Sequence, residues 1–201
     1  MTDSTPLDRR ALRRQLRQAR RQLSRAAQQR AARALYRRIA QQPAFRRART
    51  IAFYLSNDGE IDPGLLIKAA LRRHKQVYLP VLARWPRTAM AFQRLIPGQR
   101  LGRNRFAIAE PACNRARQRP AWTLDLIMLP LVGFDPHGGR LGMGGGFYDR
   151  ALAFKHRRHG WKKPVLWGLA HELQRLERLD QADWDIPLDG VITDQASYGS
   201  S

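Results

Sequence analysis

The sequence predicts an α/β fold: a single-domain, three-layer α/β/α sandwich over residues 1–201, with a mostly parallel sheet and a long basic N-terminal helix. Short apolar runs typical of buried strands alternate with segments of helical periodicity. The first two of these runs are separated by a helical segment, which favours a parallel pair. No internal repeat or low-complexity block divides the chain, and only the first few and last few residues are expected to be flexible.

The N-terminal part of the chain, from about residue 7 to residue 41, is predicted to form one long helix or two abutting helices. Its apolar stripe, at helical spacing, consists of Leu12, Leu16, Ala19 and Leu23. The candidate N-caps are Asp3, Ser4 and Asp8. Arg9, Arg13 and Arg17 are four residues apart on one face, so the outer side is very basic. For most of these arginines the alternative interpretation is a solvated face.

Two strands joined by a helix follow. Residues Thr50–Leu55 have the β-branched and aromatic content of a buried strand, and Pro63 opens a helix that runs to about Arg73. The next strand is predicted at Gln76–Pro80, which completes a βαβ unit. Glu60 lies just past the first strand, where open α/β sheets bind ligands. The alternative for Glu60 is an acid that interacts with the dipole of the following helix.

The second half of the chain is predicted to add strands around a glycine-dense segment. The predicted strands are Met90–Phe92, Asp125–Leu129, Val165–Ala170 and a final one at Val191–Thr193, with a turn at Pro97–Gly98. The glycines are Gly142, Gly144, Gly145 and Gly146, bracketed by Arg140 and Arg150. Because glycines let backbone N–H groups approach an anion and arginines add delocalised charge, this segment predicts a phosphate cradle.

Neither standard phosphate motif matches the glycine-dense segment. No Lys-Ser or Lys-Thr follows the glycines, as a P-loop needs, and Phe147 stands where the Rossmann pattern has its last glycine. A mobile hairpin or linker is the alternative. However, the continuation into Phe147–Leu152 is typical of an ordered helix, which is predicted from Gly146 to about Arg157.

Composition narrows the class of protein. No apolar run approaches the roughly 18 residues of a membrane span and the start lacks a hydrophobic signal core, so a cytoplasmic protein is expected. Cys113 is the single cysteine, and the five histidines show no ligand spacing, so neither residue type predicts a metal site. The net charge of +21 attracts polyanions as a class, including RNA, ATP and folates with a glutamate tail.

The chain carries a specific combination of short motifs. The central set is Pro130, Gly133-Phe134-Asp135, Gly139-Arg140-Leu141-Gly142, Gly144, Gly146 and Tyr148-Asp149-Arg150. Supporting motifs are Tyr54-Leu55-Ser56, Glu60-Ile61-Asp62, Leu79-Pro80, Glu110-Pro111, Gly168-Leu169-Ala170 and Asp185 with Leu188-Asp189-Gly190-Val191. Together they resemble the 5-formyltetrahydrofolate cyclo-ligase family, also called methenyltetrahydrofolate synthetase, over almost the whole chain. One departure is Phe147, since the family usually carries a tyrosine there.

The resemblance implies a set of binding residues. Those near ATP are Arg9, Arg10, Arg13, Arg140, Leu141, Gly142, Met143, Gly144, Gly145, Gly146, Phe147 and Tyr148, with Arg13 and Arg140 also catalytic. Those near the folate are Leu55, Glu60, Phe106, Met143, Gly144, Gly145, Gly146 and Phe147. The implied magnesium ligands are Asp149 and Asp185. From the residues alone, Phe106 is equally an ordinary core aromatic, and Asp149 a structural salt bridge to Arg140 or Arg150.

The implied reaction converts 5-formyltetrahydrofolate and ATP into 5,10-methenyltetrahydrofolate, ADP and phosphate, with Mg²⁺ as cofactor. The formyl oxygen is phosphorylated and N10 closes the ring, so no protein nucleophile is needed. We expect a monomer that takes folate with or without a polyglutamate tail, and neither a membrane nor a specific nucleic acid as partner. The alternatives are a non-enzymatic RNA-binding protein that uses the basic helix, and a phosphotransferase on a similar scaffold.

Overall fold

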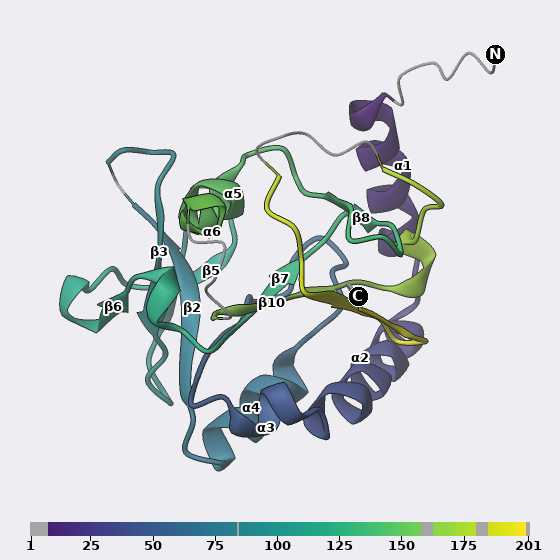
Figure 1. The fold of residues 1–201 in the computed structure, drawn as a ribbon. Helices are drawn as coiled ribbons and strands as arrows, with labels where there is room; N and C mark the ends of the chain where they lie inside the picture. Colours follow the sequence, from purple (N-terminus) through teal and green to yellow (C-terminus); the bar gives the residue numbers. More distant parts are fainter. Residues whose placement is uncertain (1–7, 84, 158–162, 180–184, 200–201) are drawn as a thin grey trace.

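A central sheet lies between two layers of helices (Figure 1). The structure is a computed structural model that describes residues 8–83, 85–157, 163–179 and 185–199. The strand order of the main sheet is β12-β11-β10-β7-β1-β2-β3-β6. Its parallel strands are β1 (Thr50–Ala52), β2 (Gln76–Leu82), β7 (Leu126–Pro130), β10 (Val165–Leu169) and β11 (Gly190–Ile192). The antiparallel strands at its margins are β3 (Met90–Arg94), β6 (Gln118–Arg119) and β12 (Ser197–Gly199). The predicted, mostly parallel α/β fold is confirmed.

Helices and short ladders complete the fold. The helices are α1 (Arg9–Arg21), α2 (Arg25–Ala40), α3 (Pro43–Arg47), α4 (Gly64–Arg72), α5 (Phe147–Leu152) and α6 (Phe154–Arg157). Short 3-10 turns lie at Arg115–Arg117, Ala121–Thr123 and Glu172–Gln174. The small antiparallel ladders pair β4 (Leu101–Arg103) with β5 (Ala109–Pro111), and β8 (Gly133–Phe134) with β9 (Arg140–Leu141).

The core has two apolar layers, one on each face of the sheet. Along β7, Leu126 and Met128 face one layer while Ile127 and Leu129 face the other, as the two-residue repeat of a strand requires. The first layer packs against α2, α3 and α4, which lie together on one side of the sheet in Figure 1. The second layer includes Leu152 of α5, which lies on the opposite side. These layers hold the carboxyl ends of the parallel strands in fixed positions.

The N-terminal segment forms two helices, the second of the two predicted arrangements, and not a single long helix. Ser24 is the N-cap of α2, and its hydroxyl accepts a hydrogen bond from the Ala27 amide at 3.2 Å. A serine here favours a new helix start because it satisfies an amide that has no partner within the helix. Asp8 caps α1 as predicted by accepting from the Arg10 amide at 2.8 Å. The other candidate caps, Asp3 and Ser4, and the ends predicted to be flexible lie outside the described residues.

Several element boundaries also differ from the predictions, and three of the differences bear on the topology. The first strand ends at Ala52, although the Phe53 amide still donates to the Tyr78 carbonyl at 2.9 Å. The helix after the glycine-dense segment is divided at Ala153 into α5 and α6. The strand predicted to be final is β11, but β12 follows it and pairs with it in the antiparallel direction. Each difference concerns a short segment whose ends depend on tertiary contacts rather than on local propensity.

Candidate functional site

A cleft of about 1370 Å³ lies at the carboxyl ends of the parallel strands. Its walls include Leu55 after β1, Leu79 of β2 and Leu129 of β7. The chain passes from β1 to β2 on one side and later returns to β7 on the other side of β1. Open α/β sheets bind ligands where the strand order reverses in this way. The topology therefore places the candidate site beside β1.

One side of the cleft carries arginines from distant parts of the chain. Arg9 NH2 lies 3.4 Å from Asp185 Oδ2, and Arg140 forms an ion pair with Asp149. Arg9 Nε and Arg140 NH1 are buried and have no hydrogen-bond partner among the residues that the structure describes. A buried guanidinium N–H without an acceptor is costly. This wall therefore has free donors for an anion.

The glycine-dense loop forms the adjacent wall. Its carbonyl groups are held by arginines: Arg13 Nε donates to Gly142 O at 2.9 Å, and Arg150 NH2 donates to Gly145 O at 2.6 Å. Within the described part of the chain, the amides of residues 142–146 donate no hydrogen bond to another protein group. Gly146 begins α5 in the left-handed region, with φ of 61°, which glycine adopts without strain. The loop thus offers backbone donors to an anion, as the sequence predicts.

The cleft also carries a largely buried carboxyl group, Glu60. Its side chain is 13% exposed, and its Oε2 accepts from the Asn57 amide at 3.1 Å. Burial raises the pKa of Glu60 to about 7, and the positive charge of Arg20 offsets part of that effect. Burial also raises the pKa values of Tyr54 and Tyr148, and the charge of Glu60 raises them further. An ionisable group with a pKa close to neutrality in a cleft is typical of a functional site.

An aromatic pair borders the cleft. Phe106 and Phe147 meet edge to face, with 5.9 Å between their ring centroids. The Arg105 guanidinium lies 5.1 Å from the Phe106 ring centroid and 5.7 Å from that of Phe147. Phe106 is 50% exposed, so it is not the core aromatic that composition alone allowed. These rings provide an apolar surface for a flat ligand.

Most of the predicted site residues line this cleft. They are Arg9, Arg13, Leu55, Glu60, Phe106, Arg140, Gly142, Met143, Gly144, Gly145, Gly146, Phe147, Tyr148, Asp149 and Asp185. Two predicted residues do not. Arg10 is exposed and lies outside the lining, and the Leu141 side chain is buried in a cluster with Leu16 and Val132. The Arg140–Asp149 ion pair is the salt bridge that the residues alone suggested for Asp149.

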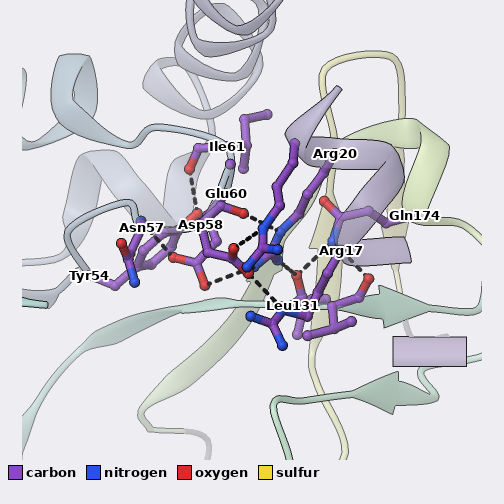
Figure 2. A network of polar contacts seen from close by, with 12 residues as sticks. Arg17, Arg20, Tyr54, Asn57, Asp58, Glu60, Ile61, Leu131 and Gln174 are labelled. Atoms are coloured by element: carbon purple, nitrogen blue, oxygen red, sulfur yellow. Dashed lines mark hydrogen bonds and ion pairs between the residues drawn. The ribbon is translucent and has the colours of Figure 1, made fainter. Parts of the chain in front are cut away.

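The structure contains a polar cluster at the end of α1 that was not among the predicted site residues. Arg17, Arg20 and Arg21 all form ion pairs with Asp58, which follows β1 (Figure 2). Burial raises the pKa of the Asp58 carboxyl. Hydrogen bonds from these three arginines outweigh that effect and hold the pKa below its ordinary value. Arg20 is fully buried, so the solvated-face interpretation, which was made for most of the arginines, does not describe it. The one signal for it is its position four residues after Leu16, on the apolar stripe.

Asp149 and Asp185, the predicted magnesium ligands, both line this cleft, as do the carboxylates Asp58 and Glu60. Among the described residues, no group of three or more acidic, histidine or cysteine side chains gathers in one place. Two carboxylates suit Mg²⁺, which usually takes one or two from the protein and completes its shell with phosphate oxygens and waters.

No helix in the described ranges is long and apolar enough to span a membrane.

Comparisons with known proteins agree with this geometry. The model of the 5-formyltetrahydrofolate cyclo-ligase family matches residues 6–194. The 5-formyltetrahydrofolate cyclo-ligase of Escherichia coli strain K12 is 41% identical over 178 residues, which cover 89% of this chain and 96% of that protein. The Haemophilus influenzae cyclo-ligase is 41% identical over 149 residues, which cover 73% and 76%. The solved structure of Aquifex aeolicus 5,10-methenyltetrahydrofolate synthetase superposes with a TM-score of 0.79 at 28% identity, covering 96% of this chain and 92% of that one. The chain therefore belongs to the 5-formyltetrahydrofolate cyclo-ligase family.

Proposed function

We propose that this ligase uses Mg-ATP to convert 5-formyltetrahydrofolate into 5,10-methenyltetrahydrofolate, with release of ADP and phosphate. The proposal is based on the chemical groups that line one cleft. Arg9 and Arg140 bring buried N–H groups that have no partner in the described part of the chain, and the largely buried carboxyl of Glu60 lines the same space. A polyphosphate and the polar edge of a pterin ring are complementary to these two groups.

The arginines and the glycine-dense loop would bind the ATP phosphates. Arg9 and Arg140 supply charged donors, and the amides of residues 142–146 supply neutral ones. Arg13 has a second role, because its bond to Gly142 O holds the loop in place. Preorganised donors of this kind stabilise charge that develops on a transferring phosphoryl group.

Asp149 and Asp185 would hold Mg²⁺ once ATP is bound. In the structure each carboxylate is paired with an arginine, Asp149 with Arg140 and Asp185 with Arg9. Phosphate oxygens are acceptors for the same arginines, so ATP would release the carboxylates toward the metal. The ion would neutralise phosphate charge and orient the phosphates for transfer.

The chemistry needs positioning rather than a protein nucleophile. The formyl oxygen attacks the γ-phosphorus, a P–O bond forms, and ADP leaves. N10 then attacks the formyl carbon and loses its proton, and the C–O bond breaks to release phosphate. Glu60 would orient the pterin by accepting its N–H groups, while Leu55, Phe106 and Phe147 would pack on the ring system. Holding both substrates in line converts a bimolecular reaction into one within a single complex.

Transfer of an oxygen isotope tests this mechanism. If the formyl oxygen is the nucleophile, ¹⁸O placed in the formyl group of the substrate appears in inorganic phosphate after turnover. Mass spectrometry of the phosphate measures this transfer, and unlabelled substrate in ¹⁸O-water is the control. If the phosphate remains unlabelled after turnover of the ¹⁸O-labelled substrate, the formyl oxygen is not phosphorylated.

We further propose that the reaction takes place in the cytoplasm and that a monomer carries it out. The arginine-rich surroundings of the cleft, including Arg17, Arg21 and Arg150, would also accept the carboxylates of a polyglutamate tail. This interaction predicts a higher kcat/KM for polyglutamylated than for monoglutamylated substrate. The ratio of the two kcat/KM values should fall as the salt concentration rises, because salt screens the attraction between the charges.

A further inference from the structure

The turn that carries Glu60 is pressed against the C-terminal end of α1. The Glu60 amide donates to the Asn57 carbonyl at 3.0 Å, and the two central residues have positive φ angles, 54° at Asp58 and 75° at Gly59. These angles define a type I′ turn, for which Asp-Gly is a favoured sequence. A Cβ atom on Gly59 would lie 3.0 Å from the Arg20 carbonyl oxygen. The turn therefore has no clearance from α1.

The Arg20 guanidinium joins this turn to the end of β7 (Figure 2). Its Nε donates to the Asp58 carbonyl at 2.8 Å, and its NH2 donates to Asp58 Oδ2 at 3.0 Å. Its NH1 donates to the carbonyl of Leu131, just after β7, at 3.1 Å. The side chain is fully buried, and its NH2 lies 3.8 Å from Glu60 Oε1. One cation thus contacts both segments that flank the strand reversal.

The other two arginines of the cluster make their direct contacts with Asp58, although the charge of Arg17 also lowers the pKa of Glu60. Arg17 Nε donates to Asp58 Oδ2 at 2.7 Å, and Arg21 forms an ion pair with Asp58 Oδ1. Among the described residues, Arg20 is the one cation with a recorded ion pair to Glu60. In the described part of the chain, the other charged or ionisable groups around Glu60 include Arg17 on α1, Asp58 on the turn, Tyr54 after β1 and Tyr148 on α5. His171 also contacts the turn, with its Nε2 3.2 Å from the Gly59 carbonyl oxygen. Arg21 can therefore serve as a control from the same cluster.

We propose that Arg20 is a positioning residue for the folate side of the site: it holds Glu60 in place as an anion that accepts hydrogen bonds from the substrate ring. The inference rests on the proposed function, because folate is the ligand of Glu60 there. Burial alone favours the neutral carboxyl, which is a poorer acceptor, and a buried positive charge close by favours the carboxylate. Arg20 has no place in the cleft lining, so it acts through Glu60 and not on the substrate.

The pH dependence of KM for 5-formyltetrahydrofolate tests the proposal. In the unmodified protein, 1/KM should fall as the pH drops through about 7, where Glu60 takes up its proton. In Arg20→Gln this midpoint should move upward by about one pH unit, so KM should rise about fivefold at pH 7 and about tenfold well below it. KM for ATP should change much less. Arg21→Gln should leave the midpoint where it is.

Two further variants test the role of Arg20 even if Arg20→Gln does not fold. Arg20→Lys keeps the charge but loses the planar fork, so KM for folate should rise several-fold while the midpoint stays in place. Glu60→Gln should remove this pH dependence altogether. An unchanged folate KM in Arg20→Lys, or an unmoved midpoint in folded Arg20→Gln, overturns the positioning role. Absence of any turnover by the unmodified protein would instead refute the proposed function.

Discussion

Replacing Glu60 with glutamine should stabilise the protein, and increasingly so as the pH rises. Burial raises the pKa of this carboxyl from 4.5 to about 7, although Arg20 opposes the effect. A carboxyl with a raised pKa binds its proton more tightly in the folded state than in the unfolded state. Its stabilising contribution is therefore complete below pH 4.5 and is lost as the pH rises toward 7. Glutamine has nearly the same shape and remains neutral at every pH.

The size of this effect follows from the two pKa values. The interval between 4.5 and about 7, at about 1.4 kcal/mol per pH unit, corresponds to about 3 kcal/mol in all. Between pH 5 and pH 8, the unfolding free energy of Glu60→Gln should rise relative to that of the unmodified protein by about 2–3 kcal/mol. A gain in stability with a loss of folate affinity is the compromise expected of a binding group held in a buried site.

Urea unfolding followed by far-ultraviolet circular dichroism at several pH values measures this difference. The exposed residue Glu177 provides the matched control, since Glu177→Gln makes the same chemical change on the surface. If the Glu60→Gln difference is constant from pH 5 to pH 8, or follows that of the control, the carboxyl does not ionise as the structure requires.

Two further substitutions test separate parts of the cleft. Arg140→Met should weaken ATP binding at least tenfold, because a charged hydrogen bond contributes about 1.5–3 kcal/mol; titration calorimetry with a non-hydrolysable ATP analogue measures the loss. An unchanged ATP affinity would exclude Arg140 from the phosphate site, and the exposed Arg10, outside the cleft lining, supplies the matched Arg10→Met control. Gly59→Ala should lower the unfolding free energy by more than about 1 kcal/mol, because the residue has a φ of 75° and faces the Arg20 carbonyl at 3.0 Å. Gly98→Ala is the matched control, with a φ of 77° but nothing within 4 Å of the added carbon, so equal losses for the two variants would show that contact with α1 contributes nothing.

The fold was largely predictable because its strands and helices have clear local signals. Segments such as Leu126–Pro130 and Val165–Leu169 are apolar runs of strand length, and the βαβ unit fixes a parallel sheet. The division of the N-terminal helix was left open, because Ser24 sits within a continuous basic pattern. The added strand Ser197–Gly199 has little apolar content, and its pairing with β11 depends on tertiary contacts.

The site was predictable where its residues belong to a motif and not where burial decides their role. The glycine-dense loop, Glu60 and Phe106 could be named from the sequence and do line one cleft. Arg20 could not be named, because an arginine on a basic helix is ordinarily solvated, and its burial depends on Asp58 and Leu131. Leu141 shows the converse: it adjoins the motif in sequence, but its side chain packs against Leu16 of α1 and does not line the cleft.

The most direct test of the central claim is formation of methenyltetrahydrofolate by the purified protein, followed by its absorbance. Product should accumulate from 5-formyltetrahydrofolate with Mg-ATP, in a one-to-one ratio with ADP, and omission of either Mg²⁺ or ATP should abolish it. Folded protein that forms no product in the complete mixture, or forms it equally fast without ATP, would refute the proposed function.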